Sequence, residues 1–245
     1  MCRLASVAFA AFSLPALLPA QLMTRLPAAA DRAFDDYVKN AEAGVDGRAR
    51  VTLDRPGVTV VPGGAKHTVD PKGAILHDWT GAVLVPGGTV ERALAVLQSY
   101  DDYKRIYAPD VTASKALGHE GNRWRAALGL HKVMVLTADY DTEYEVEYRP
   151  LGPERWAVLS RSTKVAERHD GRELAVGTGH GYIWRLNAYW LLEQRHEGVY
   201  LECRSISLSR DIPAGLGWAI RPMMTTVPRK SLQETLEATA RALLH

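Results

Sequence analysis

Hydrophobic and polar residues alternate along most of the second half of the chain. A period of two predicts β-strands with one buried face, because successive side chains of a strand point to opposite sides. Turn signals such as His169-Asp170-Gly171 and Glu197-Gly198 separate these segments, and no convincing helical pattern lies between them. We therefore expect a long antiparallel meander. The predicted strands are residues 74–85, 111–119, 122–130, 133–148, 156–167, 181–194 and 199–210.

Helical periodicity appears before the meander and again after it. Thr89 is placed to cap a helix at residues 90–97, and a second short helix is predicted at residues 101–107. Residues 26–43 have a thin apolar side and predict a peripheral helix, followed by a loop at residues 51–72 that is rich in Pro and Gly. Two short helices thus follow the first strand of the folded body.

The chain finishes with an amphipathic helix. Pro228 stands at a predicted helix entry, and Ser231 with Glu234 matches a capping box. One stripe of this helix is apolar and has to be buried. Its members are Leu232, Leu236, Ala240 and Leu243.

This order of elements is α+β rather than alternating, and it favours two layers, with the closing helix covering a curved sheet. It resembles the helix-grip fold of the START/polyketide-cyclase superfamily over residues 74–244. The sequences "SLSRDIP", "GLGWAIRP" and "VPRKSLQETLEATARALL" are similar to a subgroup of exported bacterial members. The resemblance implies a curved antiparallel sheet around a long C-terminal helix, and a hydrophobic ligand held between them.

The first twenty residues predict a secretory signal peptide. Arg3 precedes an apolar run at residues 4–20, which ends at Ala20 before Gln21. Cleavage there leaves residues 21–72 as an N-terminal helix and loop extension, and residues 73–245 as the START-like domain. We expect an exported protein, periplasmic or secreted. The alternative is a membrane anchor formed by an uncleaved N-terminus.

Composition excludes several classes of protein. Of the 245 residues 47% are hydrophobic and 24% are charged, which is typical of a globular domain rather than a disordered chain or a polytopic membrane protein. The formal net charge is +2, and the Lys and Arg residues are scattered, so nucleic acid is not an expected partner. The expected partner is a hydrophobic small molecule or lipid, with peripheral membrane contact as a further option.

The last hairpin predicts a cavity. If Glu197-Gly198 forms the turn, Trp190 lies opposite Ser205, and Ser207 and Ser209 follow on the same face. Large rings on one strand and small hydroxyls on its neighbour leave room and offer hydrogen-bond groups, as a ligand pocket requires. Alternatively, the closing helix fills this space. The candidate ligand-binding residues are Trp79, Trp184, Leu186, Trp190, Ser205, Ser207, Ser209, Trp218 and Met223.

Local sequence supplies no catalytic motif. There is no Gly-x-Ser-x-Gly elbow, and no two histidines have helical metal-ligand spacing, so neither a metal nor a cofactor is expected. Cys203 is expected to be a structural thiol. The candidates for acid–base chemistry are His77, His180 and the pair Glu202 and Arg204. We expect Glu202 and Arg204 to form an ion pair at the surface, or to enter the cavity if the strand register differs by one residue.

Three functions remain open from the sequence. The leading hypothesis is an exported protein that binds a hydrophobic ligand without chemistry of its own. The first alternative is a cyclase/aromatase-like or hydrolytic enzyme using the same cavity. The second is an envelope protein-interaction module that docks a partner on the opposite sheet face, through Tyr189, Ile206 and Leu208.

Overall fold

The computed structural model describes residues 23–64, 68–69, 73–133, 137–211 and 217–245, and for residues 68–69 and 217–225 it describes the backbone alone. The predicted signal peptide lies outside the described residues, as do the side chains of Trp218 and Met223. None of the described helices is long and apolar enough to cross a membrane.

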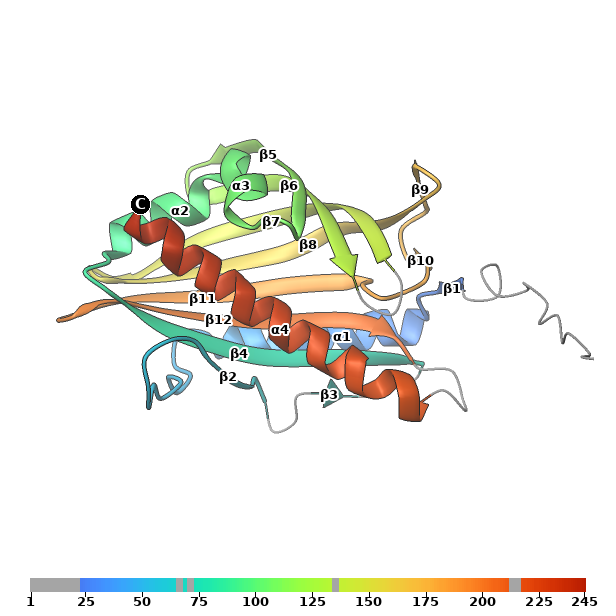
Figure 1. The fold of residues 1–245 in the computed structure, drawn as a ribbon, viewed down its shortest axis with the longest axis horizontal. Coiled ribbons are helices and arrows are strands. Elements are labelled where there is room, and N and C mark those ends of the chain that lie inside the picture. The colour runs from blue at the N-terminus through green and yellow to red at the C-terminus, as the bar shows by residue number, and fades with distance from the viewer. Residues whose placement is uncertain (1–22, 65–67, 70–72, 134–136, 212–216) are drawn as a thin grey trace, which may run out of the picture.

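A curved antiparallel sheet forms the body of the molecule (Figure 1). Two additional short strands, β3 (Thr68–Val69) and β9 (Arg172–Glu173), pair with β4 (Ala74–Pro86) and β8 (Arg155–His169), while β1 (Thr24–Arg25) pairs separately with β10 (Thr178–Gly179). The meander predicted from alternation is confirmed. In spatial order the main strands are β2 (Thr59–Pro62), β4 (Ala74–Pro86), β12 (Gly198–Arg210), β11 (Arg185–Arg195), β8 (Arg155–His169), β7 (Thr137–Gly152), β6 (Arg123–Val133) and β5 (Val111–Glu120).

Helices cover both sides of this sheet. Figure 1 shows α4 (Gly217–Leu244) crossing one side and α1 (Ala28–Ala43) lying along the other. The predicted short helices are present as α2 (Val90–Gln98), the 3₁₀ turn η2 (Tyr100–Asp102) and α3 (Tyr103–Ile106). The Thr89 hydroxyl caps α2 by accepting a hydrogen bond from the Arg92 amide at 3.3 Å.

The apolar stripe of the last helix packs as predicted, but the helix begins earlier than predicted. Leu232, Leu236 and Leu243 are buried against the sheet. Gly81 of β4 permits this close approach, since a Cβ there would lie 2.5 Å from a methyl group of Leu236. The predicted capping box at Ser231 is wrong, because α4 runs through this position and the Ser231 carbonyl accepts a bond from Thr235.

The sheet face away from α4 is also buried, which corrects the expectation of a single buried face. Tyr189, Ile206 and Leu208 form a second core with Phe34 and Val38 of α1. The helix expected to be peripheral therefore covers this face. The three sheet residues are almost inaccessible to solvent, so they cannot form the exposed docking surface considered above.

Buried ion pairs hold the N-terminal segment on this second face. The Arg204 guanidinium donates to both carboxylate oxygens of Asp78 at 2.9 and 2.6 Å, and the Tyr37 hydroxyl donates to the same carboxylate at 2.7 Å. Arg48 pairs with Glu202 at 2.7 Å. The sequence left two options for Glu202 and Arg204: a surface ion pair, or a place in the cavity beneath α4. Both are wrong, because each residue pairs with another partner on the second face.

The last hairpin pairs two residues away from the predicted register. Trp190 lies opposite Cys203, and Ser205 lies opposite Ala188, because the turn is formed one residue earlier. Gly198 belongs to the strand instead of the turn: a Cβ there would lie 2.0 Å from the Val85 carbonyl of β4. A shift of two leaves the side chains of the paired residues 185–195 and 198–210 on their predicted faces.

Candidate ligand-binding cavity

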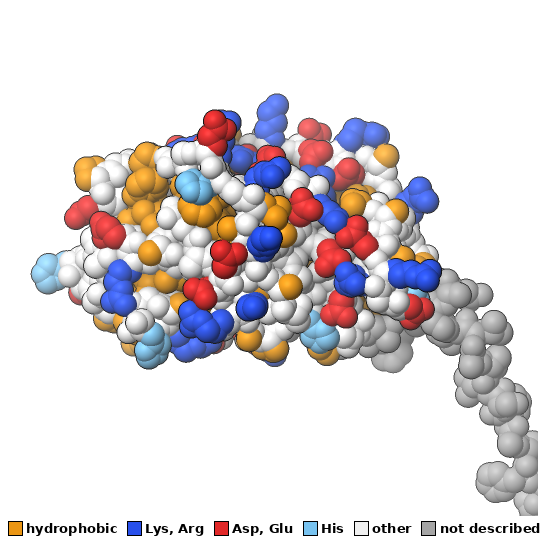
Figure 2. Space-filling model, turned by 90° about the horizontal axis from the view of Figure 1, so that it is seen from above, with side chains coloured by type: hydrophobic (Ala, Val, Ile, Leu, Met, Phe, Trp, Pro, Cys, Tyr) orange, Lys and Arg blue, Asp and Glu red, His pale blue; other side chains and the backbone are white. Residues whose placement is uncertain are grey.

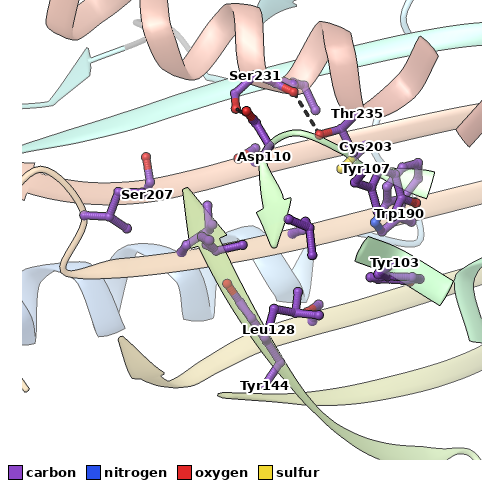
Figure 3. A pocket seen from close by; sticks show the side chains of 18 of the residues that line it. Tyr103, Tyr107, Asp110, Leu128, Tyr144, Trp190, Cys203, Ser207, Ser231 and Thr235 are labelled. Carbon is purple, nitrogen blue, oxygen red and sulfur yellow. Dashed lines mark hydrogen bonds between the residues drawn. The ribbon is translucent and has the colours of Figure 1, made fainter. Parts of the chain in front are cut away.

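A cavity of about 240 Å³ lies between the sheet and α4 (Figure 3). Its walls come from strands β4 to β8, β11 and β12, from the short helices and from the middle of α4. Most of the lining is aliphatic or aromatic, and a few polar groups are grouped within it. Residues of the apolar wall include Leu97, Val111, Ala126, Leu128, Leu130, Val146, Val158, Ile183, Val227 and Leu232.

The structure places part of the predicted site on this wall. Ser205 and Ser207 of β12 line the cavity, as do Leu186 and Trp190 of β11. Both serines are only half-buried although they are on the inner face of the sheet. Space therefore exists in front of them, and the ring-and-hydroxyl pattern of the hairpin identified this part of the wall.

Other predicted site residues lie elsewhere. Trp184 belongs to the second core beneath α1, because the backbone turns near Gly181 and regular alternation starts only at Arg185. Trp79 faces α4 but packs within the core beyond the cavity wall. Ser209 is buried behind the wall, where its hydroxyl lies 3.0 Å from Nε2 of His77.

Six tyrosines on the wall were missed in the sequence-based prediction. Most of their hydroxyl groups bond within the protein: Tyr148 and Tyr103 both donate to the Leu97 carbonyl at 2.6 Å, and Tyr100 contacts Tyr148 at 2.7 Å. Burial raises the pKa of each of these three hydroxyls, so they remain neutral. The phenolic rings therefore contribute largely apolar surface. The complete set is Tyr100, Tyr103, Tyr107, Tyr144, Tyr148 and Tyr182.

A polar cluster joins α4 to the sheet at the cavity wall. The Lys132 ammonium contacts the carboxylate of Asp110 and donates to the Ser231 hydroxyl at 2.7 Å. Ser231 in turn donates to Asp110 at 3.2 Å. Figure 3 shows Asp110 and Ser231 side by side at the cavity. The three residues are far apart in sequence, which is why no local pattern indicated them.

Cys203 of β12 lines the cavity and lies opposite Trp190 of β11. Burial is the main cause that raises the pKa of its thiol to about 12. At neutral pH almost all of this thiol is protonated, and a thiol is a poor nucleophile compared with a thiolate. Its environment thus favours the structural role expected from the sequence.

No family model and no curated protein matches the chain, whereas several solved structures do. A STAR-related lipid transfer protein from Xanthomonas axonopodis superimposes with a TM-score of 0.53 at 18% identity, over 77% of this chain and 99% of that one. The chain has the helix-grip fold of the START superfamily. Other START-fold structures include human STARD10, with TM-score 0.49, 13% identity and coverage of 89% and 82%. The Zhui aromatase/cyclase from Streptomyces superimposes with a TM-score of 0.44 at 13% identity, over 69% of this chain and 92% of that one.

Within this START fold, only one candidate for acid–base chemistry lies on the cavity wall. His77 is buried there beside Ser209. His180 instead pairs with the buried carboxylate of Glu167 and is not among the lining residues. Glu202 and Arg204 face away, beneath the N-terminal segment. A fold does not determine a function, so the site has to decide between binding and catalysis.

A second hollow of about 470 Å³ lies at the β5–β7 end of the START fold. Charged side chains of both signs line it, including Arg123, Arg125, Glu145 and Glu147. Figure 2 likewise shows acidic and basic side chains interspersed over this side of the molecule. Such a polar hollow favours water over an apolar ligand, which leaves the cavity beneath α4 as the better candidate.

Proposed function

We propose that this chain binds a hydrophobic small molecule or lipid in the cavity between the sheet and α4, without chemistry of its own. The observation that carries the proposal is the cavity wall: apolar and aromatic side chains surround a few grouped polar residues. Burial of apolar ligand surface supplies the affinity, and the polar residues orient the ligand.

The volume supports a compact ligand or a segment of a larger one. An engineered apolar cavity of about 150 Å³ accommodates benzene, with six carbons. By the same scale, a cavity of about 240 Å³ holds roughly ten non-hydrogen atoms. A medium-length alkyl chain or a bicyclic ring system has this size.

Native mass spectrometry of the purified protein after incubation with 1-octanol, 2-octanone and phospholipid vesicles tests the proposal. We expect bound apolar species, and we expect them to be lost in Ala188→Phe, which fills the cavity. Ala113→Phe is the matched control, because Ala113 is exposed on β5. No bound species in any form, or equal binding by Ala188→Phe, would contradict the proposal.

The enzymatic alternative is supported by a single observation, the position of His77 on the wall. It predicts that a bound molecule is recovered chemically changed, and that replacing His77 with Asn stops the change while binding persists. Chromatography and mass spectrometry of the extracted ligand distinguish the two: recovery of unchanged ligand supports binding alone.

A further inference from the structure

The polar cluster of Asp110, Lys132 and Ser231 carries a second inference, which rests on the proposed function and concerns the chemistry of the ligand. Among the lining residues that the structure describes, Lys132 and Asp110 are the only Lys, Arg, Asp or Glu side chains. Their charges cancel. Any ligand in the cavity therefore meets a donor-bearing cluster with no net charge.

The hydrogen bonds within the cluster leave donor capacity on Lys132. An ammonium group has three N–H donors. One contacts Asp110 and a second is donated to the Ser231 hydroxyl, so the third is available for a ligand oxygen. Ser231 is saturated as a donor, because its proton is directed to Asp110 at 3.2 Å.

The side-chain exposures show which member faces the ligand. The Lys132 side chain is 14% exposed, whereas that of Asp110 is 38% exposed. The carboxylate is thus the partly hydrated side of the cluster, and the ammonium is its more enclosed side. The enclosed Lys132 ammonium is therefore the member placed to donate a hydrogen bond to a ligand.

We propose that the cavity selects apolar molecules that carry one uncharged oxygen acceptor, such as a ketone or an alcohol, over carboxylates of the same length. The ketone or hydroxyl oxygen accepts the free N–H of Lys132. A carboxylate would add an uncompensated negative charge to the Asp110–Lys132 pair, and burying that charge costs more than its bond to Lys132 returns.

Isothermal titration calorimetry at pH 8 with 2-octanone, 1-octanol and octanoate tests this selectivity, because octanoate is ionised at that pH. The probes match the length that the cavity volume allows. In the wild-type protein we expect both neutral probes to bind about tenfold more tightly than octanoate, because the uncompensated charge of octanoate costs more to bury than its bond to Lys132 returns.

Two variants change the charge of the cluster in opposite directions. Asp110→Asn leaves Lys132 uncompensated, so the affinity for octanoate should rise by more than about tenfold, which reverses the preference. Lys132→Met removes the donor, so 2-octanone should weaken by about tenfold. Lys104→Met is the matched control, because Lys104 is exposed on α3 away from the cavity wall.

The outcomes separate this inference from the proposed function. Binding of all three probes with equal affinity, or an unchanged ratio in Asp110→Asn, overturns the selectivity and leaves the cavity as a binding site. Absence of binding by every probe overturns both. If Lys132→Met does not fold, the wild-type ratio and Asp110→Asn still decide.

Discussion

Replacing Ser207 with Leu tests whether the space beneath α4 is open. Ser207 lies on the cavity wall and is only half-buried. Leucine adds two non-hydrogen atoms to the side chain, on the order of 50 Å³ if benzene in a 150 Å³ cavity sets the scale. That is about a fifth of the cavity of about 240 Å³.

An open cavity can accept this volume without strain. We therefore expect the free energy of unfolding of Ser207→Leu to change by less than about 1 kcal/mol, whereas insertion into a closely packed core costs about 1–3 kcal/mol. Urea unfolding followed by tryptophan fluorescence measures this change. Affinity for 2-octanone should fall by about tenfold, because the leucine occupies ligand space and removes a polar group.

The same substitution at Ser162 is the matched control. Ser162 is buried in β8, and both its amide and its hydroxyl contact the Asn187 side chain, at 3.0 and 3.3 Å. Ser162→Leu should therefore be strongly destabilising. If Ser207→Leu loses as much stability as Ser162→Leu and still binds 2-octanone normally, the reasoning about the cavity is refuted.

Three further predictions concern stability and reactivity. Arg204→Met leaves the Asp78 carboxylate buried without its guanidinium partner and should lower the free energy of unfolding by about 3–5 kcal/mol. The double variant with Asp78→Leu should recover most of this loss. A loss below about 1 kcal/mol in urea unfolding of Arg204→Met would contradict the prediction. Burial raises the pKa of Tyr144 from 10.0 to about 12. Between these two values the unfolded chain loses the phenolic proton before the folded protein does, so about 3 kcal/mol of the free energy of unfolding is present below pH 10 and is lost as the pH rises to 12. Tyr144→Phe should reduce the loss of stability between pH 10 and pH 12 by about 3 kcal/mol, and an unchanged pH profile would count against it. Burial raises the pKa of the Cys203 thiol to about 12, so little thiolate is present at pH 8. In protein that carries Cys2→Ser, we expect Cys203 to react with iodoacetamide at pH 8 at least about a hundredfold more slowly than after unfolding in urea. Equal rates would show an accessible thiolate.

The elements of this fold were predictable because their signals are local. Alternation identified the strands, and helical spacing identified the buried stripe at Leu232, Leu236 and Leu243. The role of α1 was not predictable in the same way. Its partners Ile206 and Leu208 stand among charged residues on a face that looked exposed. Two of those charged residues, Glu202 and Arg185, in fact form ion pairs with the N-terminal segment.

The site was predictable where one hairpin forms it and not where distant segments meet. Ser205, Ser207, Leu186 and Trp190 come from two adjacent strands, so strand geometry was enough even with the register wrong by two. Trp184 departs from the pattern because regular strand pairing begins after it. The cluster that contains Lys132 joins three separate parts of the chain, and only the folded structure brings them together.

The most direct test of ligand binding beneath α4 is to map where an added ligand acts on the protein. Titration with 2-octanone, followed by amide chemical shifts in ¹H–¹⁵N NMR spectra, reports this residue by residue. We predict shifts at cavity residues such as Leu128, Ala188 and Cys203, and none at Glu120 or Arg123 in the polar hollow. Shifts confined to the hollow, or no shifts at saturating ligand, would contradict a binding site between the sheet and α4.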